Sequence, residues 1–396
     1  MEMKIKRKQI IPCLFTLILF MPTIISKIPA LNSIMSLLLN ITVFLMLFTW
    51  VMRGFRCSNI LKCIFLCFLV VMMSTIINQD NIISTGIVYS KMFAACYAIE
   101  WILKKETQKY EMLNVIKNIV AFYVIINLIS MIFFPDGVIQ LHQVENEYYK
   151  YTTAWWILGN KNSMFMWLYI ANILAQIDLI DSDIKKRKIY NIILILLTFI
   201  SALLSESSTT IIAIGVLSIF PIIQEFLIKT EKIFNLKTYI ILYVIFTIIL
   251  LTMTNVGIIT FVASLFGKNT TFTGRVDAWS SALKLLQQST LIGKGSLDTE
   301  SLRNVLHGYA FVNAHNAFLQ LGIEGGIILY SMVIVLGKTM IDKIKNIRID
   351  IKVFIEWAFL ALFIEMSFEA LVDSSFFWMI FVIFGAICDL QSKGYE

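Results

Sequence analysis

The order of apolar and polar positions divides this chain into long hydrophobic runs separated by short polar connections. Most runs contain about 20 residues, the length that an α-helix needs to cross the hydrocarbon core of a bilayer. Apolar residues are nearly continuous within the runs, whereas the strands of a membrane barrel alternate apolar and polar positions. We therefore predict twelve transmembrane helices, near residues 10–25, 30–52, 60–77, 82–103, 113–134, 162–180, 190–205, 208–227, 239–265, 316–337, 353–371 and 374–390.

The composition agrees with a chain that lies mostly in a membrane. It is 58% hydrophobic and 15% charged, with a mean hydropathy of +0.80, whereas soluble domains are about 45–50% apolar and about 25% charged. A bilayer offers no water to unpaired backbone groups, so the apolar runs are expected to be helical. We predict an all-α polytopic protein in which residues 1–396 form a single membrane domain.

The 33 lysines and arginines are distributed unevenly among the connections. Most lie in alternate connections, such as the basic run at 185–188, and this excess is typical of cytoplasmic loops. Both termini are therefore predicted to be cytoplasmic, and two long polar segments, about 135–161 and 266–315, to lie outside. The second of these connects the ninth and tenth helices. The net charge of +7 belongs to these loops, so we do not expect a nucleic-acid partner.

An amphipathic helix is predicted near the start of the polar stretch 273–326. Its apolar stripe consists of Val276, Trp279, Leu283 and Leu286. Thr273 is a plausible N-cap, which places Arg275 in the first turn beside free backbone N–H groups. A helix N-terminus with a guanidinium group can bind an anion, and arginine matches phosphate oxygens with two hydrogen bonds. The alternative is an arginine that only anchors the helix among lipid head groups.

His315 is one of three histidines, with His142 and His307. It lies where the second outer loop enters the tenth helix, and near neutral pH it can take a proton from a hydroxyl group. The alternative is an interfacial histidine that bonds to a backbone carbonyl. Two histidines without carboxylates at ligand spacing do not make a metal site, and we expect no metal.

Gly293, Lys294, Gly295 and Ser296 contain a glycine-lysine pattern that invites comparison with a nucleotide-binding loop. Such a loop needs a longer glycine spacing between a strand and a helix, and neither condition holds here. We interpret this stretch as a tight turn that ends the amphipathic helix.

Several ionisable residues fall within or at the ends of predicted membrane helices. Lys91 lies in the fourth helix and Glu324 in the tenth, and each costs roughly 2.5–3.5 kcal/mol at the bilayer centre on insertion scales. Glu365, Glu369 and Asp373 are spaced by four residues, which would place them on one helical face. These side chains could line a hydrophilic cleft, pair with lysines within the bundle, or couple proton movement in a transporter.

Three segments together resemble the Wzy/WaaL superfamily of O-antigen and capsule polymerases and O-antigen ligases. The first is the run 158–164, with Gly159 and Asn162, and the second is the Ser/Thr-rich junction 205–210. The third and most specific begins with Thr273, Gly274 and Arg275 and continues through Trp279, Gly293, Gly295, Ala314, His315, Asn316, Leu319, Glu324 and Gly325.

The resemblance implies an inverting glycosyltransferase of the bacterial cytoplasmic membrane, independent of metals and nucleotides. Its substrate would be an oligosaccharide linked to undecaprenyl diphosphate, and its partners would be membrane lipid, a chain-length regulator and a flippase. Arg275 matches an arginine thought to hold the diphosphate, and His315 matches a histidine thought to assist the acceptor hydroxyl. The further candidate substrate contacts are Asn316, Lys294, Asn162, Glu324 and Trp279.

The junction 205–210 departs from the family pattern, because relatives often carry an arginine there and this chain has Ser208, Thr209 and Thr210. The residue that makes the second contact with the diphosphate is therefore not identified. The leading hypothesis is a polymerase of polysaccharide repeat units, with an O-antigen ligase as the alternative within the family. A flippase of lipid-linked oligosaccharides or a secondary transporter is the alternative from another class. We see no internal repeat of the kind common in transporters, and the outer loop favours the enzyme.

Overall fold

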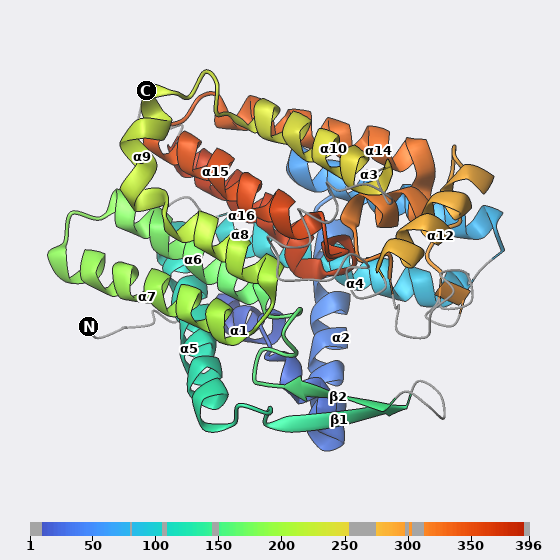
Figure 1. The fold of residues 1–396 in the computed structure, drawn as a ribbon, viewed down its shortest axis with the longest axis horizontal. Coiled ribbons are helices and arrows are strands. Elements are labelled where there is room, and N and C mark those ends of the chain that lie inside the picture. The colour runs from blue at the N-terminus through green and yellow to red at the C-terminus, as the bar shows by residue number, and fades with distance from the viewer. Residues whose placement is uncertain are drawn as a thin grey trace.

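The computed structural model describes residues 10–79, 81–104, 109–144, 150–252, 275–297, 301–302 and 313–391. In these ranges the regular structure is helical except for one two-stranded hairpin (Figure 1). The elements, in chain order, are α1 (Ile10–Leu19), η2 (Thr23–Lys27), α2 (Pro29–Met52), α3 (Asn59–Ile77), α4 (Ile82–Leu103), α5 (Lys109–Phe133), β1 (Ile139–Val144), β2 (Lys150–Trp155), α6 (Phe165–Asp181), α7 (Lys185–Leu204), α8 (Ser208–Ser218), α9 (Phe220–Lys229), α10 (Leu236–Thr252), α12 (Arg275–Gln288), α14 (Ala317–Ile344), α15 (Ile349–Met366), η4 (Leu371–Asp373) and α16 (Ser375–Gln391).

Each apolar segment predicted from the sequence coincides with one of these helices or with two consecutive ones. Among the described residues, six helices are long and apolar enough to cross a membrane, namely α2, α3, α4, α5, α7 and α14. The pair α8 and α9, bent by 63°, makes a seventh candidate if it is one span, while α1, α10 and α16 are apolar but shorter. The prediction of a helical multi-pass membrane protein is confirmed, and the number twelve stays a prediction.

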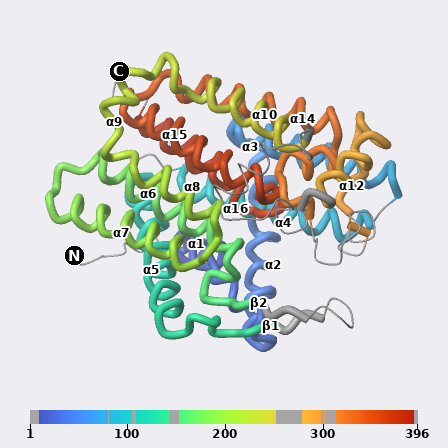
Figure 2. Tube along the Cα trace, viewed as in Figure 1, coloured from blue at the N-terminus to red at the C-terminus, as the bar shows by residue number. Residues whose placement is uncertain are grey.

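The core of the bundle forms around α6, in which every residue from Phe165 to Asp178 is buried. Helices α5, α7, α8 and α15 pack around it, while α3 packs along α14 and α16 along α4 (Figure 2). Aromatic rings join the N-terminal part to this core. Phe20 stacks on Phe376 with ring centroids 5.5 Å apart, and both rings contact Trp167 edge-on.

The first predicted outer loop, about 135–161, contains the hairpin. Strands β1 and β2 are antiparallel, with Ile139 opposite Trp155. The hairpin is fixed to the bundle by Trp156, whose indole N–H donates to the carbonyl of Phe134 at 2.8 Å. In Figure 1 it projects on the lower side of the view, away from α12. Much of the second predicted outer loop, including 253–274 and 303–312, lies outside the described residues.

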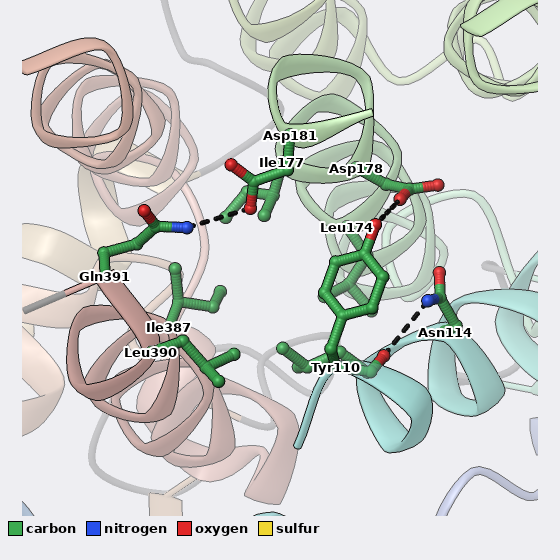
Figure 3. Close-up of a pocket in the computed structure, with 10 residues that line it drawn as sticks. Tyr110, Asn114, Leu174, Ile177, Asp178, Asp181, Ile387, Leu390 and Gln391 are labelled. Carbon is green, nitrogen blue, oxygen red and sulfur yellow. Dashed lines mark hydrogen bonds between the residues drawn. The ribbon is translucent and has the colours of Figure 1, made fainter. Parts of the chain in front are cut away.

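A buried ionic cluster joins α5, α6 and α7. Asp178 accepts hydrogen bonds from the Tyr110 hydroxyl at 2.7 Å, from the Arg187 Nε at 2.9 Å and from the Asn191 amide at 2.8 Å, and it pairs with Lys117. Figure 3 shows the bond from Tyr110 to Asp178 at the edge of a cavity of about 20 Å³. A buried carboxylate is tolerated when its lone pairs are occupied in this way, so we assign this cluster to the structure of the bundle.

Helix α14 is broken at Gly326, which has φ 58° and ψ −151°. The turn that follows α12 supplies the hydrogen bonds lost at the break. The carbonyl of Thr290 accepts from the Ile327 N–H at 2.9 Å, and that of Leu291 accepts from the Ile328 N–H at 3.2 Å. A broken membrane helix is stable only where neighbouring groups replace the missing backbone bonds. The turn and α14 therefore form one unit.

Gly326→Ala is expected to destabilise the protein, because this backbone conformation is open almost only to glycine and costs about 1–3 kcal/mol for other residues. A Cβ there would also lie 2.5 Å from the Thr290 oxygen. The measurement is thermal unfolding of the purified protein in detergent.

Gly337→Ala is the matched control in the same helix. Gly337 has no neighbouring atom within 4 Å of an added Cβ, and alanine favours a helix interior over glycine. We expect an unchanged or higher melting temperature for Gly337→Ala and a lower one for Gly326→Ala. Equal melting temperatures for the two variants would contradict a strained break at Gly326.

Candidate functional site

The start of α14 is fastened to the end of α15 by Asn316. This residue is fully buried and caps α14, because its side-chain oxygen accepts from the Leu319 N–H at 3.0 Å. Its amide group donates to the carbonyl of Ser367 at 2.9 Å. Both ends of the Asn316 amide are thus used within the protein. We assign Asn316 a structural role that fixes the residue before it, and its predicted substrate contact remains untested.

His315 is held in a left-handed conformation, with φ 46°, directly before this cap. Its backbone N–H donates to the Asn313 side chain at 2.9 Å. The imidazole Nδ1 lies 3.1 Å from a carboxylate oxygen of Glu369, and the two side chains are 17% and 10% exposed. A carboxylate at Nδ1 favours the tautomer that carries its proton there, so Nε2 is the nitrogen able to accept a proton.

A second group of polar residues lies below His315 along α14. The Gln320 side-chain oxygen accepts from the Ala314 N–H at 3.0 Å, and its amide donates to Glu324 at 3.0 Å. Glu324 also accepts from the hydroxyl of Tyr89, on α4, at 3.0 Å. The carboxyl group of Asp373, in η4, lies within hydrogen-bonding reach of Glu324.

The expectation that Glu365, Glu369 and Asp373 share one helical face is wrong. Helix α15 ends at Met366, and the chain then turns through η4 before α16. Glu365 remains on the helix, is fully buried and accepts from the hydroxyl of Thr210 at 3.1 Å. Glu369 reaches His315, and Asp373 reaches Glu324. Because the helix ends, the three acids serve three different partners.

The hydrogen bond from Thr210 to Glu365 lies at the junction where the resemblance leaves the second diphosphate contact open. Thr210 is in the first turn of α8 and is fully buried. Its hydroxyl also lies 3.2 Å from that of Ser207. The junction therefore contacts the end of α15 through the hydroxyl group of Thr210, which donates to the carboxylate of Glu365.

The predicted amphipathic helix is confirmed as α12, but its buried face differs from the predicted stripe. The buried residues are Ala278, Trp279, Ala282 and Leu285, and they pack against α14. Trp279 is fully buried, with its ring 6.4 Å from that of Phe368. It anchors α12 to the residue before Glu369, and its predicted substrate contact stays a prediction.

Arg275 is the first residue of α12, and its side chain lies outside the described part of the structure. One helical turn separates it from Trp279, which belongs to a small apolar cluster with Ala314 and Phe368. Ala314 and Phe368 directly precede His315 and Glu369. The first turn of α12 is thereby brought to the same end of the bundle as the histidine.

The tight turn predicted at Gly293 to Ser296 is confirmed. Its glycines have φ 70° and 83°, and it packs between α3 and α14. The Lys294 N–H donates to the Ile323 carbonyl at 2.6 Å, and the Ser296 N–H donates to the Thr75 hydroxyl at 3.0 Å. This contact fixes the backbone of Lys294, and the role of its ammonium group stays a prediction.

Two sequence candidates are not joined to this group by any contact among the described residues. Asn162 lies in the turn before α6, where its N–H donates to the Asn160 side chain at 3.1 Å. Lys91 is half-buried on α4 and makes no ion pair in the described ranges. Conversely, Tyr89 and Gln320 belong to the site but were not predicted from the sequence, because an isolated tyrosine or glutamine in an apolar run is typical of a packing residue.

An apolar groove lies on the side of the bundle, and its lining includes the two residues that precede Glu369 in the chain. It has a volume of about 250 Å³ and lies between α8, α10 and α15. Tyr243, Phe246 and Phe363 are among its lining residues, together with Ser367 and Phe368. The groove is open and almost entirely apolar, so it suits a hydrocarbon chain.

A search of the curated proteins found no match. A model of the family described as O-antigen ligase matches residues 193–334. This range includes α12, the tight turn, His315 and the first part of α14, and members of the family are glycosyltransferase-like enzymes. The match confirms the resemblance to the Wzy/WaaL superfamily, and residues 193–334 are the part of the chain that is similar to the O-antigen ligase family.

Proposed function

We propose that this protein is a polysaccharide repeat-unit polymerase of the bacterial cytoplasmic membrane. It joins oligosaccharides linked to undecaprenyl diphosphate at the outer face, by inverting glycosyl transfer without a metal or a nucleotide. The observation that carries the proposal is the pair of His315 and Glu369, held at the start of α14 beside an apolar groove. In this proposal both termini of the protein are cytoplasmic, and the chain crosses the membrane twelve times.

In the proposed reaction, Nε2 of His315 takes the proton from an acceptor hydroxyl as its oxygen attacks the anomeric carbon. The bond from that carbon to the phosphate oxygen breaks, and undecaprenyl diphosphate leaves with the bonding electrons. Attack opposite the leaving group inverts the configuration. Glu369 stabilises the imidazolium that forms, in the way that a carboxylate supports a general-base histidine.

The leaving group needs positive charge where its negative charge develops. Arg275 and Lys294 are the proposed contacts, from the first turn of α12 and from the turn that follows it. A helix N-terminus adds backbone N–H groups to such a site. Because nucleotide donors are confined to the cytoplasm, the energy for the new bond must arrive with the lipid-linked diphosphate itself.

The apolar groove between α8, α10 and α15 is the proposed seat of the polyprenyl tail. Its lining includes Ser367 and Phe368, which directly precede Glu369 in the chain. A tail in this groove would therefore bring its diphosphate to the level of His315. A chain-length regulator and a flippase are proposed as partners, because a polymerase must receive its substrate at the outer face.

A ligase is the second candidate, and the family description of residues 193–334 favours it. Both enzymes would use the same donor and the same histidine. They differ only in the acceptor, which is another lipid-linked repeat unit for the polymerase and a different glycolipid for the ligase.

Reconstitution of the purified protein tests the proposal. We expect vesicles that contain only this protein and its lipid-linked repeat unit to form longer chains without nucleotide and with a chelator present. Product length is measured by gel electrophoresis. Transfer only to an added glycolipid acceptor would assign the ligase. Movement of the lipid-linked sugar across the vesicle membrane without chain extension would contradict both enzymes and indicate a flippase.

A further inference from the structure

A cavity of about 380 Å³ opens at the other end of α14 from His315. Lys343, near the end of α14, lines it, and none of its lining residues belongs to the group around His315. The rest of the lining comes from the start of α3, the end of α4, the start of α5 and the later part of α16. The cavity is thus separate from the proposed glycosyl-transfer site and its role does not rest on that function.

The lining of this cavity carries more positive than negative charge. Four basic residues face two acidic ones, namely Arg56, Lys104, Lys109 and Lys343 against Glu100 and Asp389. By contrast, many surface lysines of the chain project singly into solvent. A concave site with a net charge of one sign attracts ligands of the opposite sign.

The two carboxylates are already engaged within the protein. Glu100 accepts from the Ser58 N–H at 3.1 Å and from its hydroxyl at 2.5 Å. Asp389 is shared by Lys343, at 2.5 Å, and Lys109, at 3.7 Å. Asp389 is therefore occupied by two lysines, and Glu100 is oriented toward Ser58, so the lining keeps an excess of positive charge.

Three basic groups are left with weak or no pairing inside the protein. The Lys109 side chain is only 8% exposed, and its 3.7 Å contact with Asp389 is too long for a hydrogen bond. Arg56 and Lys104 line the same cavity and have no ion pair within the described ranges. An ammonium group as buried as that of Lys109 costs free energy unless it is paired. The cavity therefore presents three cationic groups that an anionic ligand could pair with.

The position of the cavity indicates what kind of anion would fit. Arg56, Lys104 and Lys109 fall just outside the predicted apolar segments, at the depth of lipid head groups. Beside them the wall is apolar, formed by Ile60, Leu103, Val382 and Ala386. Basic pockets between membrane helices with this mixture of walls bind phosphate head groups.

We propose that this cavity binds the phosphate group of an anionic ligand. The group can come from an anionic phospholipid of the adjacent leaflet or from a free phosphate in solution. In both cases Arg56 and Lys104 contact phosphate oxygens at the mouth, and Lys109 contacts one from within. The apolar wall adds a place for an acyl chain in the first case only.

The test uses the purified full-length protein in a neutral detergent. Binding is measured as a thermal shift on titration with dioctanoyl phosphatidylglycerol, dioctanoyl phosphatidylcholine or sodium phosphate, each at matched ionic strength. The variant is Arg56→Gln with Lys104→Gln, both at exposed positions, so that folding is retained. The matched control is Lys185→Gln with Lys186→Gln, which removes the same charge from the exposed start of α7.

We expect the wild-type protein and the control to bind phosphatidylglycerol, and the cavity variant to bind it about thirtyfold more weakly. A response to phosphatidylglycerol without one to sodium phosphate assigns the phospholipid, and a response to sodium phosphate assigns the free anion. Equal binding of phosphatidylcholine, an equal loss in the control, or no binding of either phosphate probe would overturn the proposal.

Discussion

His315→Ala is expected to slow chain extension in the reconstituted vesicles by about a hundred- to ten-thousandfold. The reason is that the histidine is the only described group at the start of α14 that combines a basic nitrogen with a carboxylate partner. In cells, single repeat units on lipid diphosphate should accumulate at the outer face, because their supply continues while joining stops. The measurements are the initial rate of chain extension and the sidedness of the accumulated lipid.

Two further variants are compared with His315→Ala. Glu369→Gln tests the carboxylate partner, and His142→Ala is the control. Glu369 acts through His315 as a positioning residue, so its loss should cost about tenfold to a hundredfold, by analogy with partners of metal-bound histidines. It should also shift the pH profile of the rate, which a purely structural residue would leave unmoved. His142 belongs to strand β1, in the hairpin away from α12, and its removal should leave the rate unchanged. Full activity of His315→Ala with a folded protein would remove the proposed base.

The helices could be located from the sequence, whereas their interruptions could not. A continuous apolar run contains enough information to predict a helix, because only helices satisfy the backbone in a bilayer. The run 208–227 contains Pro221, at the start of α9, but proline is tolerated within membrane helices, so its presence alone did not predict the 63° bend between α8 and α9. The break at Gly326 depends on carbonyl groups of Thr290 and Leu291, which are about 35 positions earlier in the chain. Hydrogen bonds that come from residues so distant in the chain leave no recognisable pattern in the sequence around the break.

The candidate site was predicted in part, because motif and geometry carry different information. The motif pointed to His315, and the structure adds the carboxylate that orients it. Glu369 was visible in the sequence, but its spacing from Glu365 suggested a continuing helix. The helix ends instead at Met366, where the Ser367 hydroxyl bonds back to the Phe363 carbonyl at 2.9 Å. Only the fold shows that this ending turns Glu369 toward α14.

The position of α12 gives a physical reason to test Arg275 next. The helix begins at Arg275 and is anchored one turn later by the buried Trp279. Trp279 packs with Phe368 and Ala314, the residues before Glu369 and His315. A guanidinium group at this helix start would therefore meet a diphosphate beside the histidine, with backbone N–H groups as additional donors.

Arg275→Ala is expected to lower the rate of chain extension by about a hundred- to a thousandfold, the usual effect of removing one oriented donor from a site that stabilises a leaving group. Arg275→Lys should recover part of this loss, because lysine keeps the charge but cannot form two parallel hydrogen bonds to phosphate. The matched control is Lys284→Ala, which removes an exposed charge from the same helix and should leave the rate unchanged. If the two alanine variants lose activity equally, Arg275 and Lys284 act only through general attraction to lipid head groups, and the diphosphate contact is refuted.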